Sequence, residues 1–163
     1  MKVAIIMGSD SDLPVLEPAL KTLAEFGVAA EVVVASAHRT PEKVHDFVTT
    51  AADRGVGVFI AAAGAAAHLP GVVASFTTLP VIGVPVNSTS LGGMDALLSI
   101  VQMPAGIPVA TMAINGAKNA ALFAVQILGT AEPALQEKLA AYRRTMAAEV
   151  EQKAAKVTAS LNK

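Results

Sequence analysis

The sequence contains no cysteine, and only 4 % of its 163 residues are aromatic. Without cysteine there is no disulfide framework and no thiol nucleophile, which suits a reducing cytoplasm. The three histidines are scattered, and without cysteine they form no recognisable metal site, so we expect no metal. Neither a dinucleotide-binding fingerprint nor a Walker A sequence is present.

Charge is also scarce, since Asp, Glu, Lys and Arg make up only 15 % of the chain. The chain has 12 basic and 13 acidic residues, so it lacks the excess of positive charge that is typical of nucleic-acid-binding proteins. The apolar start, residues 1–7, is too short for a signal peptide. The longest apolar run, residues 56–67, falls short of the ~18–20 residues that span a membrane. We therefore expect a soluble cytoplasmic protein without a membrane partner.

Apolar residues reach 53 % of the chain, which is high for a soluble monomer. The simplest physical account is that other subunits cover part of the apolar surface, which predicts a homo-oligomer.

Apolar runs alternate with helical patterns along the whole chain, which predicts an α/β fold. The pattern indicates right-handed βαβ units and a three-layer, doubly wound parallel sheet of about five strands in a single domain, residues 1–163. The expected strands are residues 2–7, 28–35, 56–63, 81–86 and 107–114. The expected helices are residues 13–26, 41–55, a short one towards 76, 90–101, 117–128 and about 132–160.

The last of these helices carries an apolar stripe. Its residues recur at steps of three, four or seven: Leu135, Leu139, Tyr142, Met146, Val150, Val157 and Leu161. The stripe covers a rod of ~39 Å at 1.5 Å per residue, whereas the radius of gyration of such a domain is about 15 Å. Either part of the stripe packs on a neighbouring subunit, which we favour, or the helix is a frayed and solvated tail.

The strongest local signal is the segment Ser36-Ala37-His38-Arg39-Thr40-Pro41, which follows an apolar run that we interpret as a buried strand. Pro41 is typical of a first helical turn, with Thr40 as its N-cap. Ligands bind at this carboxyl edge in open α/β sheets. Arginine can hold a phosphate with two hydrogen bonds, and an imidazole can move a proton near neutral pH. By residue type alone, a structural role for His38 is as plausible as a catalytic one.

A second polar loop, Gly8-Ser9-Asp10-Ser11-Asp12, joins the first strand to the first helix. Its hydroxyls and free backbone N–H groups could cradle a phosphate, with the carboxylates turned to ribose hydroxyls. The alternative is a purely structural role, in which Asp10 or Ser11 caps the helix.

Small side chains dominate a third loop, residues 64–71, which ends in His68-Leu69-Pro70-Gly71. Such a loop allows a ligand to approach the backbone closely, but it equally suits close helix–sheet packing. From residue type we favour a structural role for His68 over an acid–base role. We interpret His45, between Lys43 and Asp46, as a solvated surface residue. The polar segments 87–95 and 99–109 would each be interpreted as a loop.

Four stretches, taken together, resemble the N5-carboxyaminoimidazole ribonucleotide mutases of purine biosynthesis. They are Met7-Gly8-Ser9-x-Ser11-Asp12, Ser36 to Pro41, Ala66-Ala67-His68-Leu69-Pro70-Gly71 and Ser99-Ile100-Val101-Gln102-Met103-Pro104. The resemblance extends from Val3 to about Arg144. It implies a flavodoxin-like fold, a homo-octamer with active sites between subunits, and carboxyl transfer from N5 to ring carbon C4 without a cofactor.

The resemblance also implies roles for individual residues. Ser9 and Arg39 would bind the 5′-phosphate region, and Asp12 the ribose hydroxyls. Ser36 would line the site, His38 would be the general acid/base, and His68 would lie on the loop that encloses the carboxyl group. The other substrate-binding residues would be Gly8, Ser11, Gly64 and Leu69.

The chemistry of the residues agrees with this role. Aminoimidazole C4 is a nucleophile, so CO2 released from N5 can be attacked there, after which a base removes the C4 proton. The segment from Ser99 to Pro104 fits the mutases better than the sister enzymes that carboxylate the aminoimidazole ribonucleotide directly. A nucleotide-binding module without activity is the non-enzymatic alternative.

The chain departs from the family pattern at two positions, because Ala62 and Ala65 stand where glycine is common. An added methyl group there would narrow the CO2 pocket, or strain the backbone where φ is positive. The segment from Ile114 to Asn119 is also slightly shorter than the common form.

Overall fold

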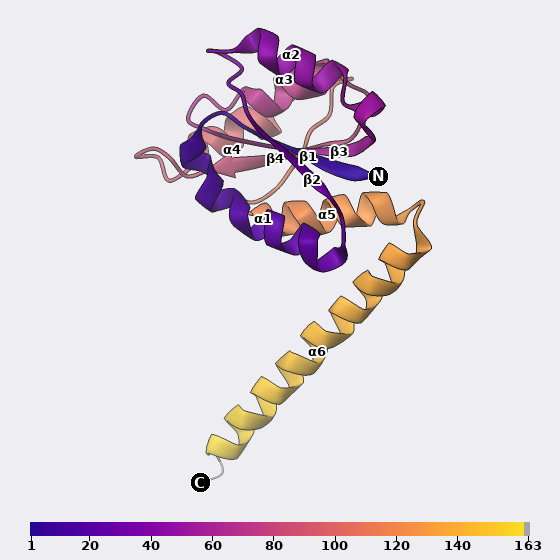
Figure 1. Cartoon of the computed structure of the whole chain (residues 1–163). Helices are drawn as coiled ribbons and strands as arrows, with labels where there is room; N and C mark the ends of the chain where they lie inside the picture. Colours follow the sequence, from indigo (N-terminus) through magenta and orange to yellow (C-terminus); the bar gives the residue numbers. More distant parts are fainter. Residues whose placement is uncertain (162–163) are drawn as a thin grey trace.

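A computed structural model describes residues 1–161, and the last two residues of the predicted 1–163 domain lie outside this range. Five parallel strands form one sheet in the order β2-β1-β3-β4-β5, the flavodoxin-like order (Figure 1). The strands are β1 (Lys2–Met7), β2 (Ala30–Val34), β3 (Val56–Gly64), β4 (Val81–Val86) and β5 (Ala110–Thr111). The helices are α1 (Leu13–Phe26), α2 (Pro41–Thr49), α3 (Leu69–Ser75), α4 (Met94–Val101), α5 (Ala117–Gly129) and α6 (Pro133–Leu161). The predicted fold class is confirmed.

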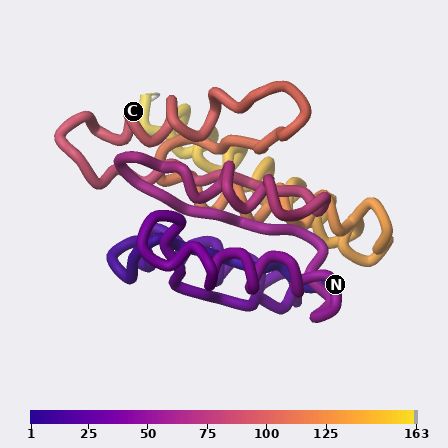
Figure 2. The backbone as a smooth tube through the Cα atoms, turned by 90° about the horizontal axis from the view of Figure 1, so that it is seen from above, coloured from indigo at the N-terminus to yellow at the C-terminus, as the bar shows by residue number. Residues whose placement is uncertain are grey.

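The two faces of the sheet carry separate hydrophobic cores. Side chains alternate along β1, so that Val3 and Ile5 face one core while Ala4 and Ile6 face the other. Helices α1 and α5 cover the first face, and α2, α3 and α4 cover the second (Figure 1). Helices on both faces of the sheet give the expected three-layer arrangement. Seen from above, the early segments in indigo and purple and the later ones in orange lie on opposite sides, which follows the strand order from β2 to β5 (Figure 2).

Strand β2 differs from the prediction of a buried strand over residues 28–35. It is shorter, and it lies at the edge of the sheet with β1 as its neighbour. Because one side of an edge strand has no partner, its side chains are not buried on both faces. Val32 and Val34 are 44 % and 43 % exposed. The expectation of burial was wrong.

Three predicted elements are shorter in the structure, for identifiable reasons. The strand expected over 107–114 is reduced to two residues, between Pro108, which has no N–H, and Asn115, whose φ is +56°. The helix expected from residue 90 starts at Met94, because Gly92 and Gly93 have φ of +63° and +85°. The second helix ends at Thr49, and a separate 3-10 turn, Ala52–Arg54, follows it.

The apolar side chains of helix α4 are divided between the core and the surface. Ala96 and Ile100 pack into the core, whereas Leu91 in the preceding loop and Leu98 and Val101 on the helix are 65 %, 51 % and 49 % exposed. This leaves a patch of large apolar side chains on the surface.

Helix α6 leaves the body of the molecule (Figure 1). Only its first turns pack, through buried Leu135 and Leu139 and through Tyr142, whose ring lies 5.7 Å from that of Phe26. The later stripe residues, Met146, Val150, Val157 and Leu161, are exposed. The expectation that the stripe extends beyond its own domain is confirmed, while its packing on a neighbour stays a prediction.

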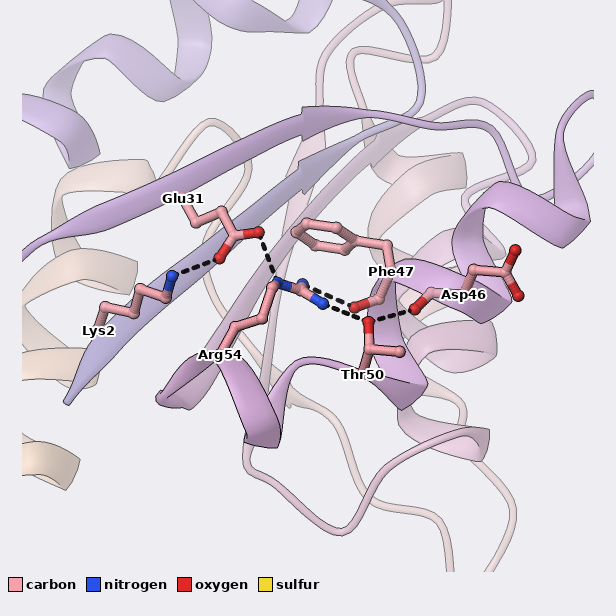
Figure 3. Close-up of polar contacts among 6 residues, drawn as sticks. All are labelled: Lys2, Glu31, Asp46, Phe47, Thr50 and Arg54. Carbon is pink, nitrogen blue, oxygen red and sulfur yellow. Dashed lines mark hydrogen bonds and ion pairs between the residues drawn. The ribbon is translucent and has the colours of Figure 1, made fainter.

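An ionic cluster at the amino end of the sheet ties three elements together (Figure 3). Glu31 on β2 pairs with Lys2 on β1 and with Arg54 after α2, each at 2.8 Å. The guanidinium of Arg54 also stacks on Phe47, 4.8 Å from the ring centroid, and donates to Thr50 and to the Phe47 carbonyl. The Lys2 ammonium, followed by the Arg54 guanidinium, lowers the pKa of Glu31 below its ordinary value.

Candidate active site

The predicted site residues meet at the carboxyl edge of the sheet. Gly8 to Asp12 follow β1, Ser36 to Thr40 follow β2, and Gly64 ends β3. Strands β1 and β3 are neighbours in the sheet although β2 separates them in sequence. Their carboxyl ends therefore form the crevice at which open α/β sheets bind ligands.

The loop after β2 is held in place by hydrogen bonds from two of its own side chains. The Ser36 hydroxyl accepts hydrogen bonds from the backbone N–H groups of His38 and Arg39, at 3.3 and 3.2 Å. Thr40 stands at the N-cap position of α2, as predicted, but its side chain does not cap the helix. Its hydroxyl oxygen accepts from the Ser36 N–H at 2.9 Å and donates to the Ser36 carbonyl at 3.3 Å. Two hydroxyl side chains thus fix the backbone that carries His38 and Arg39.

The loop after β1 is closed by a capping box around a 3-10 turn. Ser9 is the N-cap, its hydroxyl accepts from the Ser11 N–H at 3.3 Å, and its own N–H donates to Asp12 at 3.2 Å. The alternative that Asp10 or Ser11 is the cap was therefore wrong. Asp10 instead accepts a hydrogen bond from the Ser9 hydroxyl at 3.1 Å.

Arg39 joins these two loops. Its guanidinium donates to the Gly8 carbonyl at 2.9 Å, which uses one of its five N–H donors and leaves the others for a ligand. Asp12 is almost fully buried and lies close enough to Arg39 for the guanidinium charge to act on its carboxyl group. Burial raises the pKa of Asp12, and the hydrogen bonds from the backbone of Ser9 and Gly8, with the charge of Arg39, only partly offset this. The site thus combines a cation with a desolvated carboxyl group.

The two predicted site histidines are in direct contact. Nε2 of His38 lies 2.8 Å from Nδ1 of His68, and the two rings meet edge to face with centroids 4.9 Å apart. A hydrogen bond of this length requires one proton between the facing nitrogens, so one ring donates and the other accepts. A proton bound by one imidazole can therefore be passed to the other.

These residues surround one cavity of about 310 Å³, near the lower end of the range for small-molecule sites. Its lining contains nine of the ten predicted site residues, namely Gly8, Ser9, Ser11, Asp12, Ser36, His38, Arg39, Gly64 and Leu69. The tenth, His68, contacts the cavity through His38. A more open hollow of about 450 Å³ adjoins it and shares Gly8, Ser9, Ser36 and Arg39.

Four lining residues were missed by the sequence reasoning: Ala37, Ala63, Ala66 and Ser88. The alanines carry no chemical signal of their own. Ser88 lies in a polar segment after β4, and its position at the carboxyl edge was the one signal that could have found it. The segment from Ser99 to Pro104 lies outside this lining, although Met103 lies against Gly71.

The third loop is strained at Ala65, one of the two positions that depart from the family pattern. Ala65 has a φ of +50°, a conformation that glycine adopts much more easily. Gly64, beside it, has no room for a side chain, because a Cβ there would lie 2.0 Å from the Ser88 Oγ. Ala62, the other departure from the family pattern, is fully buried within β3.

Other predictions concern groups away from the cavity. His45 is exposed on α2 and pairs with Asp46 at 3.2 Å, as expected of a surface residue. Residues 1–161 contain no group of three or more His, Asp or Glu side chains that could hold a metal ion. Within the same residues, every helix is too short or too polar to cross a membrane.

A family model described as AIR carboxylase matches residues 2–149. The chain belongs to the AIR carboxylase family. An N5-carboxyaminoimidazole ribonucleotide mutase from Pyrococcus horikoshii is 59 % identical over 152 residues, which cover 93 % of this chain and 86 % of that relative. The mutase of the same name from Thermotoga maritima is 55 % identical, with 94 % and 90 % covered. Among solved structures, PurE of Treponema denticola superposes with a TM-score of 0.84 at 29 % identity, covering 94 % of this chain and 96 % of that one.

Proposed function

We propose that this chain is an isomerase that moves a carboxyl group from N5 to C4 of carboxyaminoimidazole ribonucleotide in purine (IMP) biosynthesis. It would act in the cytoplasm as a single catalytic domain of residues 1–163, without metal or organic cofactor. One observation carries the proposal: the histidine pair lies in the same small cavity as Arg39, Ser9 and Asp12. The names of relatives at 55–59 % identity support it.

The cavity suggests how the ribonucleotide binds. The remaining donors of Arg39, together with Ser9, suit the 5′-phosphate. The Ser9 hydroxyl, which donates to Asp10 here, would donate to a phosphate oxygen instead. Asp12, with oxygens that only accept when ionised, suits the ribose hydroxyls. The aminoimidazole ring would then face His38, with Gly8 and Ser11 from the loop after β1 and Ser36 from the loop after β2 lining the same cavity.

The reaction needs one proton in and one proton out. Protonation of N5 by the histidine pair accompanies cleavage of the N5–carboxyl bond, which leaves the free amine and CO2. C4 then attacks CO2, a C–C bond forms, and the C4 proton returns to His38. Loss of the C4 proton restores the aromaticity of the imidazole ring, and the histidine pair regains the proton that it supplied to N5. His68, whose Nδ1 lies 2.8 Å from His38 Nε2, can supply a proton to His38 before the first step and accept one from it after the second.

CO2 must stay beside C4 between the two bond changes. The end of β3, the loop after it and the start of α3 line the cavity with Ala63, Gly64, Ala66 and Leu69, here called the far wall. These residues are small or apolar, so their side chains offer water no hydrogen bond. Holding CO2 there would give it an effective molarity towards C4 on the order of 10⁵ M or more.

The nearest alternative is direct carboxylation of aminoimidazole ribonucleotide by CO2, to which the description of the family model refers. Both substrates should be assayed at low and at high bicarbonate. We expect turnover of carboxyaminoimidazole ribonucleotide that does not depend on added bicarbonate. Turnover of the uncarboxylated ribonucleotide alone, and only at high bicarbonate, would contradict the mutase and favour the carboxylase.

The same proposal includes a homo-octamer with active sites between subunits and with α6 packed on a neighbour. Its support is the amount of large apolar surface on this chain: Val32, Val34, Leu91, Met94, Leu98 and Val101, with the outer stripe of α6. Light scattering at micromolar concentration tests it, and the mass of a single chain would contradict it.

A further inference from the structure

Ser88 is the side chain that the loop after β4 contributes to the cavity. Its Oγ lies directly above the Cα of Gly64, since a Cβ built on that glycine would be only 2.0 Å away. The serine therefore occupies the space that a side chain on Gly64 would take. It borders the far wall at Gly64 and lines the same cavity as Ala63, Ala66 and Leu69.

The backbone on both sides of Ser88 is held in place. On one side, the N–H of Asn87 donates to the side chain of Asn115 at 2.9 Å, and Asn115 adopts its positive φ at that point. On the other side, the Thr89 hydroxyl donates to Asp95 at 2.8 Å and accepts from the Leu91 N–H at 3.3 Å. Ser88 thus has a fixed position between two anchored residues.

The hydroxyl of Ser88 itself is not used by the fold. Ser36 Oγ holds the backbone of its own loop, and the hydroxyls of Ser9 and Ser11 bond within theirs. Within residues 1–161, no hydrogen bond involves Ser88 Oγ. The other side chains of the far wall have no donor at all, because they are alanine, glycine and leucine.

We infer that the Ser88 hydroxyl donates a hydrogen bond to the transferred carboxyl group and to the CO2 formed from it, and so holds it against C4. This rests on the proposed function. A carboxylate placed against an apolar wall loses hydration, and a donor there replaces part of it. Ser88 keeps its own proton throughout, so it is a substrate-positioning contact, and the histidines still supply and receive the proton of the reaction.

The test is to compare Ser88→Ala, Ser88→Thr and Ser90→Ala with the unchanged protein. Ser90 is, like Ser88, an exposed serine of the same loop, but it lies outside the cavity lining, which makes it the matched control. The measurement is the share of turnovers that release CO2 and free aminoimidazole ribonucleotide instead of the C4-carboxylated product. Total consumption of substrate is recorded alongside it.

We expect Ser88→Ala to lower the rate of carboxylated product by about tenfold, the low end for a hydrogen bond to a charged group, and to raise the released share. Ser88→Thr, which keeps the hydroxyl, should recover most of the transfer, and Ser90→Ala should match the unchanged protein. Equal rates and equal release for Ser88→Ala and Ser90→Ala would overturn the inference. If the unchanged protein does not convert the substrate, the proposed function itself fails.

Discussion

Two loops face each other across the cavity and are built on different principles. Hydrogen bonds hold the loop after β2, where Ser36 and Thr40 fix the backbone that carries His38. The loop after β3 is held by shape: Gly64 leaves room for Ser88, and Ala65 accepts a strained φ of +50°. The first presents His38 and Arg39, while the second provides a close-fitting wall and ends in His68, the partner of His38. Substitutions should therefore alter chemistry in one loop and retention or stability in the other.

The largest effect is expected for His38→Asn in the first loop. Asparagine can still form a hydrogen bond, but it cannot hold a proton, so turnover should fall at least ~10²-fold while ribonucleotide affinity is retained. Steady-state kinetics and titration calorimetry measure the two quantities. His45→Asn, on the exposed face of α2, is the control and should change neither. Unchanged turnover in His38→Asn would exclude His38 as the general acid/base, whereas ribonucleotide binding by both forms with no turnover in either would support the module that binds without catalysing.

The next largest effect is expected for Gly64→Ala in the second loop. Its Cβ would collide with Ser88 at 2.0 Å and lie 3.2 Å from the Val86 carbonyl oxygen, so the wall must move into the cavity. We expect a loss of about 1–3 kcal/mol in stability from overpacking, together with a loss of activity. Gly55→Ala, where φ is +80° and the space is open, should lose stability alone. Equal activity in both variants would show that the wall tolerates the added methyl group.

A smaller effect of opposite sign is expected for Ala65→Gly. Glycine relieves the left-handed strain at Ala65 but increases the entropy of the unfolded chain, so the net gain should be about 0.5–1 kcal/mol. Chemical denaturation measures it. Loss of stability would mean that the methyl group of Ala65 makes contacts worth more than the strain. A matched substitution, Ala66→Gly, lacks this strain and should be destabilising.

The smallest effect lies outside both loops, in the cluster around Glu31. The pKa of Glu31 is lowered by Lys2 and Arg54, so its contribution to stability is present above the ordinary value of 4.5 and is lost as pH falls through the lowered pKa. Thermal melting at a series of acidic pH values should show a shallower loss of stability for Glu31→Gln than for the unchanged protein. Identical slopes would exclude a role for this carboxylate in acid unfolding, and either result should leave the cavity unaffected.

The comparison of the two loops also explains what could be predicted. Ser36 to Pro41 stood out because histidine, arginine and serine carry chemistry that residue type alone suggests. The contact between His38 and His68 could not be foreseen, because it joins positions 30 residues apart after two different strands. Ser88 was missed for the same reason, since its importance comes from the missing side chain of Gly64. The exposure of Val32 and Val34 on β2 was not predicted, because a run of β-branched residues has the same sequence pattern in a central strand and in an edge strand.

The sequence by itself determined the alternation of strands and helices and the residue types available for binding and proton transfer. Periodicity and side-chain chemistry are local properties, and they can be deduced without coordinates. The tertiary structure alone decided which strand lies at the edge, which face of α4 is exposed, and which loops meet around the cavity. These follow from strand order and crossover packing, which bring distant residues together and which no local pattern contains.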